Sequence, residues 1–194
     1  MFDVRFSCWT RVATLAGDPD WDRLSGRLGG IRQTFLNLVA GRSASLTDDA
    51  IAGLAPFGGG RLETKVRFIN PLLQTRADVV FDYVNGRNYR FVRLDRATGR
   101  LIVGQVGTVG GVGASVLSVR VPRLFARLDI WHHLRVDIDP VGGTVKVYVD
   151  RAALPALTKT YAETGVGRVG VAATGGRRTV AFDNVTVWDT TVLP

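Results

Sequence analysis

The fold is indicated most clearly by one stretch, Leu134-Arg135-Val136-Asp137-Ile138-Asp139-Pro140-Val141-Gly142-Gly143-Thr144-Val145-Lys146-Val147-Tyr148-Val149. Apolar and polar residues alternate on both sides of a Pro-Val-Gly-Gly turn, which is the period of a half-buried strand. Placing Asp139 opposite Thr144 brings all the apolar residues onto one face. The same register puts Asp137 opposite Lys146 and Arg135 opposite Tyr148 on the other face. A slip by one residue would mix both faces, so we predict a β-hairpin in this register.

A second hairpin is predicted from Val79–Tyr83 and Asn88–Asp95, on either side of Asn85-Gly86. Asn-Gly is typical of a two-residue type I′ loop, but that register places Phe81 opposite Arg90 and mixes the faces. A three-residue loop at 85–87, with the glycine in a bulge, keeps the faces consistent. We therefore predict the register of the longer loop, which has three cross-strand pairs: Phe81 with Phe91, Tyr83 with Tyr89, and Asp82 with Arg90.

Further strand-like stretches follow at short intervals, separated by glycine and proline: Arg61–Ile69, Leu101–Val106, Ser115–Val121, Arg168–Ala173 and Thr179–Trp188. Only Thr47–Leu54 and Val121–Ile130 have the composition of a short helical turn. Many short alternating strands predict an all-β sandwich or barrel. Charge is distributed evenly, and the chain has no repeat or linker. We therefore expect residues 1–194 to form one domain.

Composition excludes several classes of protein. Of the 194 residues, 46% are hydrophobic and 22% charged, which is enough apolar material for a core and argues against disorder. No apolar run approaches the roughly 18 residues that cross a bilayer. The N-terminal residues lack the basic-then-apolar pattern of a signal peptide. Cys8 is the single cysteine, so no internal disulfide is expected.

The formal net charge is +8, and 22 of the 25 basic residues are arginine. Each half of the chain contributes +4, and the longest basic run is Arg177-Arg178. Nucleic-acid-binding proteins concentrate their cations, so nucleic acid is not an expected partner. The remaining charge favours acidic partners mildly.

The C-terminal third carries an ordered series of motifs: Trp131–Val136, Val145–Asp150, Gly167–Val171 and Ala181–Val187. This series resembles the closing strands of the concanavalin A-like lectin/glucanase superfamily, particularly its laminin-G-like and 3-keto-disaccharide-hydrolase-like branches. Arg61–Phe68, Ala77–Tyr83 and Asn88–Asp95 are similar to its central strands, and Trp21–Leu28 to its opening. The resemblance covers nearly the whole chain. It implies a two-sheet antiparallel jelly roll whose first and last strands lie together, often extracellular or at a cell surface.

The sequence departs from the family's enzymes. The glucanases of the family use a Glu-x-Asp-x-x-Glu strand, in which one carboxylate attacks and another donates a proton. The two glutamates of this chain, Glu63 and Glu163, are far apart and neither lies in such a pattern. We therefore expect no glucanase activity of this type. Arg151 also replaces the usual glycine after the Val-Tyr-Val-Asp strand.

Two sets of aspartates are candidate metal ligands. Asp18, Asp20 and Asp22 alternate in the oxygen-rich manner that calcium favours, although the positions for an EF-hand glycine and glutamate hold other residues. The resemblance implies that Asp3 and Asp183 could meet, if the end strands pair. The alternatives are a solvated turn for the first set and backbone hydrogen bonds for Asp183. His132 and His133 point to opposite faces of a strand, which argues against one shared metal.

Glycan binding needs aromatic faces for sugar rings and planar polar groups for hydroxyls. We predict two outward sets of ligand-binding residues, one for each hairpin: Asp82, Asn88 and Arg90, and then Arg135 and Tyr148 with Asp137. Tyr83, Tyr89 and Trp21 are candidate aromatic platforms. Asp137 and Asp139 are expected on a solvated outer face rather than as an acid pair. Core packing is expected for Trp131, Phe81 and Phe91, and it is the alternative for Trp21.

Three functions remain open. The first is a non-catalytic, lectin-like module that binds glycan or an acidic surface polymer. The second is a structural subunit that assembles with copies of itself in a surface layer, filament or virion. The third is a glycoside-active enzyme whose site follows no familiar motif.

Overall fold

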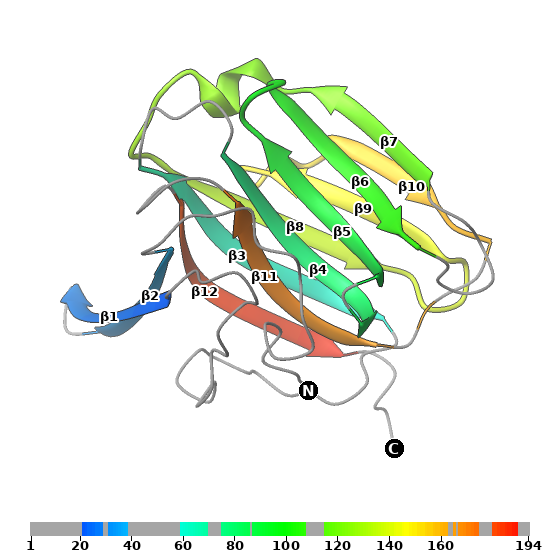
Figure 1. The fold of residues 1–194 in the computed structure, drawn as a ribbon, viewed down its shortest axis with the longest axis horizontal. Helices are drawn as coiled ribbons and strands as arrows, with labels where there is room; N and C mark the ends of the chain where they lie inside the picture. The colour runs from blue at the N-terminus through cyan, green and yellow to red at the C-terminus, as the bar shows by residue number, and fades with distance from the viewer. Residues whose placement is uncertain are drawn as a thin grey trace.

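A computed structural model describes residues 21–28, 31–38, 59–69, 75–85, 87–107, 115–162, 165, 167–174 and 180–189. Their strands form two antiparallel sheets that pack face to face (Figure 1). In the view of Figure 1, β4, β5, β6 and β7 lie in front of β3, β8, β9 and β10. The predicted all-β, two-sheet sandwich is confirmed.

The larger sheet has seven strands in the order β1-β2-β12-β3-β8-β9-β10. Its strands are β1 (Trp21–Leu28), β2 (Ile31–Leu38), β12 (Val180–Asp189), β3 (Gly60–Phe68), β8 (Trp131–Ile138), β9 (Thr144–Val149) and β10 (Leu157–Thr160). β12 therefore lies between β2 and β3, two strands that are more than a hundred residues earlier in the sequence.

The smaller sheet has five strands in the order β11-β4-β5-β6-β7. Its strands are β11 (Arg168–Thr174), β4 (Arg76–Asn85), β5 (Asn88–Asp95), β6 (Arg100–Val106) and β7 (Ser115–Arg120). The connection from β7 to β8 contains a 3-10 turn, η2 (Pro122–Phe125), with Pro122 at its start, inside the predicted helical stretch at 121–130. The other predicted helical stretch, Thr47–Leu54, lies outside the described residues.

The core lies between the two sheets because each strand turns its apolar side inward. The larger sheet contributes alternate residues of β3, β8 and β9, such as Leu62, Val66, Leu134, Val136 and Val147. The smaller sheet contributes Val79, Phe81, Val92, Leu101 and Val103. All ten side chains are almost completely buried, so the period-two pattern of the sequence becomes the inner surface of the sandwich.

The predicted β8–β9 hairpin is confirmed residue by residue. Leu134 pairs with Val149, Arg135 with Tyr148, and Asp137 with Lys146. The backbone N–H of Asp139 donates to the carbonyl of Thr144 at 2.9 Å, which closes the turn where it was expected. Both polar pairs lie on the outer side of the sheet, since the residues between them are in the core.

The predicted register of the β4–β5 hairpin was wrong. Val80 pairs with Phe91 and Phe81 with Arg90, and the register shifts only afterwards, before Asn85 meets Asn88. Asp82 lies in this irregular segment with φ +51°, a left-handed conformation that residues other than glycine rarely adopt. The faces do not mix, because Arg90 points into the sandwich together with Phe81.

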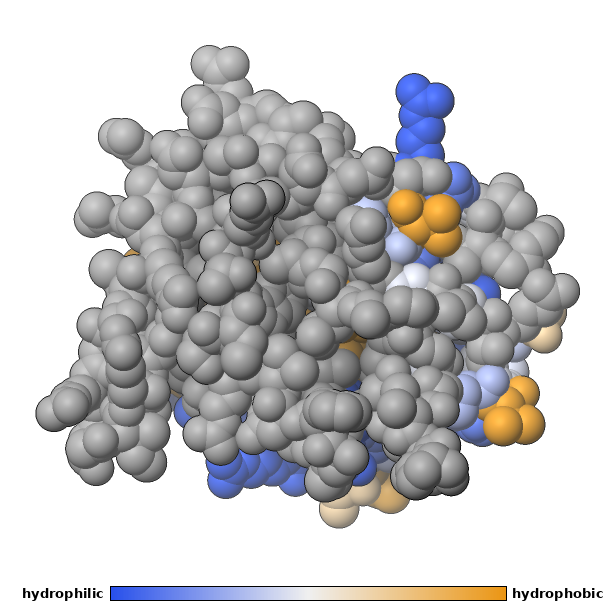
Figure 2. Space-filling model, turned by 90° about the horizontal axis from the view of Figure 1, so that it is seen from below, coloured by the Kyte–Doolittle hydropathy of each residue, from blue (hydrophilic) through white to orange (hydrophobic). Residues whose placement is uncertain are grey.

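Three strands were not predicted from periodicity: β1, β2 and β10. The other strands agree with the prediction within a few residues. No helix in the described part of the chain has the length and hydrophobicity to cross a membrane. The coloured residues of Figure 2 show hydrophobic spots that are separated from one another by hydrophilic residues.

Candidate ligand face on the larger sheet

Strands β3, β8 and β9 turn a row of polar and aromatic side chains outward. β3 pairs with β8 so that Arg61 is opposite Asp137 and Arg67 is opposite Trp131, and β8 pairs with β9 on its other side. The outward residues alternate with core residues on every strand. We call this surface the polar face; it consists of Arg61, Glu63, Lys65, Arg67, Trp131, His133, Arg135, Asp137, Lys146 and Tyr148.

Asp137 is the centre of one end of the polar face. Nε of Arg61 donates to its Oδ1 at 2.8 Å, and Nη2 of Arg61 lies 3.5 Å from Oδ2. Nε of Arg135 lies 3.4 Å from the same Oδ2. The hydrogen bond to Asp137 is the largest contribution to a raised pKa of Arg61. Asp137 therefore holds two guanidinium groups in place on neighbouring strands.

Glu63 and His133 form a second contact between β3 and β8. Oε2 of Glu63 lies 3.3 Å from Nε2 of His133, and its Oε1 lies 4.0 Å from Nε of Arg61. His132, the preceding residue, contacts Asp150 instead: its Nδ1 lies 3.0 Å from Oδ2 of Asp150. The two histidines thus have separate carboxylate partners, as expected for neighbours on opposite sides of a strand.

A guanidinium group lies over each of the two aromatic rings of the polar face. Cζ of Arg135 lies 3.6 Å from the centre of the Tyr148 ring, and Cζ of Arg67 lies 4.6 Å from that of Trp131. Both distances suit cation–π stacking. Trp131 is half-buried on the outer side, so the expectation that it packs in the core was wrong. Trp131 is an even number of residues from Arg135 and Asp137 along the strand. This spacing could have indicated that its side chain points to the same outer face.

Of the predicted ligand-binding residues, Arg135, Asp137 and Tyr148 lie on the polar face. Sequence reasoning did not include Arg61, Glu63, Arg67 and His133 in a site. Arg61–Arg67 alternates charged and uncharged residues, which is visible in the sequence, but the pairing of β3 with β8 is not. Asp139, two residues beyond Asp137, is a turn residue: the backbone N–H groups of Gly142 and Val141 donate to its carboxylate and lower its pKa.

Asp82 and Arg90 were predicted to point outward, and this was wrong. Nη1 of Arg90 donates to Oδ2 of Asp82 at 2.8 Å inside the sandwich, and Nε donates to Oε1 of Gln105 at 3.0 Å. The guanidinium also lies over the Tyr161 ring, 4.0 Å from its centre. Burial is the largest influence on Asp82 and raises its pKa, while Arg90 lowers it. The predicted pairing of Asp82 with Arg90 is present, but it is part of the interior.

Tyr83, Tyr89 and Phe91 lie together on the other side of the smaller sheet. The ring centres of Tyr83 and Tyr89 are 6.2 Å apart, and those of Tyr89 and Phe91 are 6.1 Å apart. All three are buried, with Val80 and Ala172, in a second hydrophobic cluster. Asn88 is half-buried where β5 begins. The predicted residues of this hairpin are therefore divided between the two sides of their sheet.

The proposed metal ligands are placed only in part. Asp3, Asp18 and Asp20 lie outside the described residues. Asp22 lies in β1 opposite Asn37, and Asp183 lies in β12 opposite Phe35 and Lys65, but the positions of their side chains are not described. Among the side chains that are described, no group of three or more His, Cys, Asp or Glu could hold a metal ion. The calcium prediction remains a prediction.

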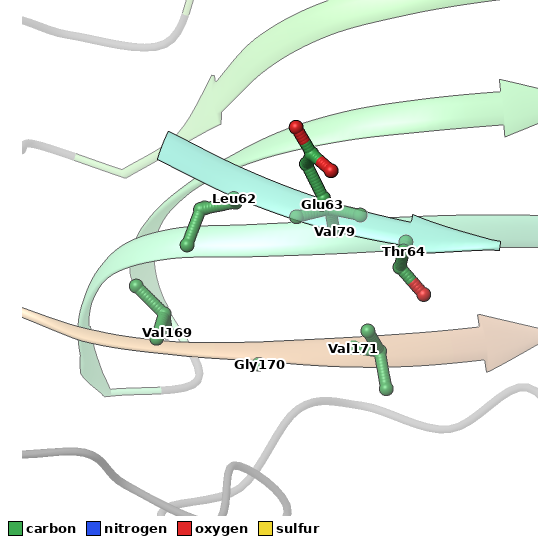
Figure 3. Close-up of a pocket in the computed structure, with 7 residues that line it drawn as sticks. All are labelled: Leu62, Glu63, Thr64, Val79, Val169, Gly170 and Val171. Carbon is green, nitrogen blue, oxygen red and sulfur yellow. The ribbon is translucent and has the colours of Figure 1, made fainter. Parts of the chain in front are cut away.

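A small cleft lies between β3 and β11, on the inner side of the larger sheet. Leu62, Thr64, Val79, Val169 and Val171 line it, together with Glu63 and Gly170. Figure 3 shows the carboxylate of Glu63 on the side of β3 away from the other labelled side chains. The cleft is therefore mostly apolar, and the polar groups of this strand belong to the polar face.

The architecture is similar to several solved structures of carbohydrate-active proteins. The carbohydrate-binding module CBM66 from Bacillus subtilis is 16% identical with a TM-score of 0.56, over 90% of this chain and 94% of the module. A prokaryotic β-1,3-1,4-glucanase (lichenase) derived from a mouse hindgut metagenome is 11% identical with a TM-score of 0.57, over 97% of this chain and 98% of the enzyme. The β-glucanase of Bacillus licheniformis is 13% identical with a TM-score of 0.53, over 90% and 94%.

No protein-family model and no curated protein sequence matches the chain. At identities this low, a structural likeness establishes the fold alone. The function must therefore be argued from the chain's own residues.

Proposed function

Since this chain has the concanavalin A-like jelly-roll fold, we propose that it is a glycan-binding module and that the polar face is its ligand site. The fold hosts carbohydrate-binding proteins and hydrolases alike, as the structures above illustrate. A module of this kind would act at a cell surface or outside the cell, where glycan polymers are accessible.

One observation carries the proposal: the polar face combines two half-exposed aromatic rings with planar polar groups. Trp131 and Tyr148 lie on the adjacent strands β8 and β9, and the guanidinium group of Arg135 lies against Tyr148. Sugars offer apolar C–H surfaces that pack on such rings and hydroxyls that bond to guanidinium and carboxylate groups. The described surface of the smaller sheet differs, because its aromatic rings are buried.

Binding would be reversible recognition by a preformed surface. The ion pair of Arg61 with Asp137 and the contact of Glu63 with His133 connect β3 to β8, so these side chains need little further ordering when a ligand arrives. Orientation of the sugar would come from the guanidinium and carboxylate groups, and the aromatic rings would supply buried area.

Binding is favoured over hydrolysis because both carboxylates of the polar face are engaged by basic groups. A general acid needs a carboxyl that keeps its proton, which desolvation provides. Glu63 and Asp137 instead lie against His133 and Arg61 at half-exposed positions. Hydrolysis of a glucan that stopped in a Glu63→Gln or Asp137→Asn variant would contradict a purely binding role.

The test is a glycan array probed with the wild-type chain and two variants of Trp131. Trp131→Phe keeps an aromatic surface, whereas Trp131→Leu removes it and keeps an apolar side chain. We expect binding to at least one polysaccharide, retained in Trp131→Phe and weakened roughly tenfold or more in Trp131→Leu, since stacking rings are hot spots of recognition. Failure to bind any glycan, or equal binding by both variants, would refute the proposal.

Self-assembly is a second candidate, favoured by the exposed residues of β7. β7 is the last strand of the smaller sheet in the described part, and Val116 and Leu117 on it are 64% and 41% exposed. An exposed apolar strand at a sheet edge is a template for pairing with another chain. A second copy of this chain would be the partner.

A further inference from the structure

The charges of the polar face are unbalanced. Its outward positions carry five permanent cations and two carboxylates: Arg61, Lys65, Arg67, Arg135 and Lys146 against Glu63 and Asp137. Both carboxylates already contact basic groups, Asp137 with Arg61 and Arg135, and Glu63 with His133. A third carboxylate, that of Asp129, lies 3.2 Å from Nη1 of Arg67, so cations still outnumber carboxylates on and beside the face. Ligands of this surface will therefore meet a net positive potential.

Hydrogen-bond donors are also in excess on the same surface. Among the described side chains, three buried nitrogen atoms have no hydrogen-bond partner: Nε of Arg67, Nδ1 of His133 and Nε of Arg135. All three belong to the polar face. Nε of an arginine can only donate. Nε of Arg135 lies 3.4 Å from Oδ2 of Asp137 without forming a hydrogen bond, and all three atoms are buried, so a ligand would meet the terminal N–H groups of the guanidinium instead.

The arginines concerned can reach a ligand. Arg67 and Arg135 keep 28% and 27% of their side chains exposed, although their Nε atoms are covered. Each guanidinium lies against an aromatic ring, so its terminal N–H groups have a defined direction. Planar guanidinium groups held in this way suit bidentate binding to carboxylate or sulfate oxygens.

Cations extend across all three strands. Arg67 lies at one end of β3 and Arg61 at the other, while Lys146 is exposed on β9. Positions that face outward along a strand recur about every 7 Å. A ligand that spans the face would thus meet several cations in succession, which suits a polymer with repeated negative charges.

We infer that the polar face recognises an anionic polysaccharide, whose carboxylate or sulfate groups are taken by Arg67, Arg135 and Lys146. The inference rests on the proposed glycan-binding function and specifies the ligand class of that site. The excess of cations favours a charged ligand over a neutral one, because anionic oxygens form the stronger hydrogen bonds to guanidinium. Nucleic acid also carries repeated negative charges, and the experiment below therefore includes it as a competing ligand.

The test compares the binding of four polymers to the full chain by calorimetry: polygalacturonate, dextran sulfate, neutral β-1,3-1,4-glucan and double-stranded DNA. Lys146→Glu and Arg67→Gln are the variants, and Arg120→Glu, an exposed arginine on β7 of the other sheet, is the matched control. Lys146→Glu and Arg120→Glu change the net charge equally, so only their positions differ. Far-UV circular dichroism verifies that each variant is folded.

We expect polygalacturonate or dextran sulfate to bind about tenfold tighter than the neutral glucan, and more weakly at high salt. Lys146→Glu should weaken that binding by about tenfold, because attraction becomes repulsion, while Arg120→Glu changes it less than about threefold. Arg67→Gln should also weaken the binding of the anionic polymer, because it removes a positive charge without adding a negative one. Comparison of the affinities for polygalacturonate and dextran sulfate shows whether the face prefers carboxylate or sulfate groups.

Three results would overturn the inference and leave the proposed function standing. The first is equal or tighter binding of the neutral glucan that is lost in Trp131→Leu. The second is equal loss of polyanion binding in Lys146→Glu and Arg120→Glu, which would indicate a net-charge effect. The third is binding of DNA as tight as that of polygalacturonate. Absence of binding to any glycan, charged or neutral, would refute the proposed function itself.

Discussion

Oδ2 of Asp82 accepts a hydrogen bond from Nη1 of Arg90 at 2.8 Å, and the two side chains are only 4% and 2% exposed. Gln105 and Tyr161 also contact the guanidinium. The hydroxyl of Tyr161 donates to the carbonyl of Gly104 at 3.1 Å. This buried polar cluster joins the two sheets, because Tyr161 follows β10 of the larger sheet while Gly104 lies in β6 of the smaller one.

Asp82→Ala should be strongly destabilising. The substitution leaves the Arg90 guanidinium buried without its carboxylate, and breaking a buried ion pair from one side costs roughly 3–5 kcal/mol. Asp129→Ala is the control, since Asp129 is 66% exposed and 3.2 Å from Arg67, and exposed pairs contribute about 0–1 kcal/mol. Urea unfolding of both variants measures the difference. Equal losses of stability would contradict the assignment of Asp82 to the interior.

Gly143→Ala and Gly99→Ala form a matched pair. Both glycines have a left-handed backbone, with φ of +61° and +64°. A Cβ at Gly143 would clash with the carbonyl oxygen of Tyr161, whereas none of the surrounding atoms lies within 4 Å of a Cβ at Gly99. Gly99→Ala should therefore cost about 1–2 kcal/mol for the backbone alone, and Gly143→Ala roughly 1–3 kcal/mol more. Thermal or chemical unfolding gives both values. Equal losses of stability in the two variants would contradict the predicted clash with Tyr161, because they would mean that the turn can shift away from that carbonyl at no cost.

Asp139→Asn should make the stability of the fold less dependent on pH in the acid range. The N–H groups of Gly142 and Val141 lower the pKa of Asp139 below its ordinary value of 3.8. A lowered folded-state pKa stabilises the fold above pH 3.8, and this contribution is lost as the pH falls through the folded-state value. Wild type should therefore melt at a higher temperature than the variant at neutral pH, and the gap should narrow below pH 3.8. A gap that is independent of pH would contradict the carboxylate's role in the turn.

The β8–β9 hairpin could be predicted because its information is local. Each residue from Leu134 to Val149 either alternates between the two faces or belongs to a short turn, and only one register keeps the faces apart. This local pattern is sufficient to place Arg135, Asp137 and Tyr148 on an outer face. The pairing of β3 with β8 was not predictable in this way, because the two strands are far apart in the sequence. Glu63 and Arg61 therefore could not be assigned to the site from the sequence.

The β4–β5 hairpin shows where reasoning from the sequence failed. Arg90 was placed outside because the three-residue loop gave two consistent faces, with Arg90 opposite Asp82 on the polar one. An arginine can lie in the core only when it is paired and hydrogen-bonded. Its partners include groups from three separate places: Asp82 at an irregular position, Gln105 on β6 and Tyr161 after β10. Periodicity alone does not reveal such a set of partners. The assumption that both faces must be uniform then led to the wrong register.

Val116→Lys should reduce self-association, if the chain pairs through the edge of its smaller sheet. The valine is 64% exposed on β7, and lysine on an edge strand opposes pairing by charge. Val141→Lys is the control, because Val141 is 94% exposed but lies in the β8–β9 turn. Sedimentation velocity over a range of concentrations should show dimers for wild type and Val141→Lys, and mainly monomers for Val116→Lys. A wild-type chain that stays monomeric at the highest concentration, or equal effects of both lysines, would exclude β7 as an assembly edge and leave glycan binding as the sole role supported for the described residues.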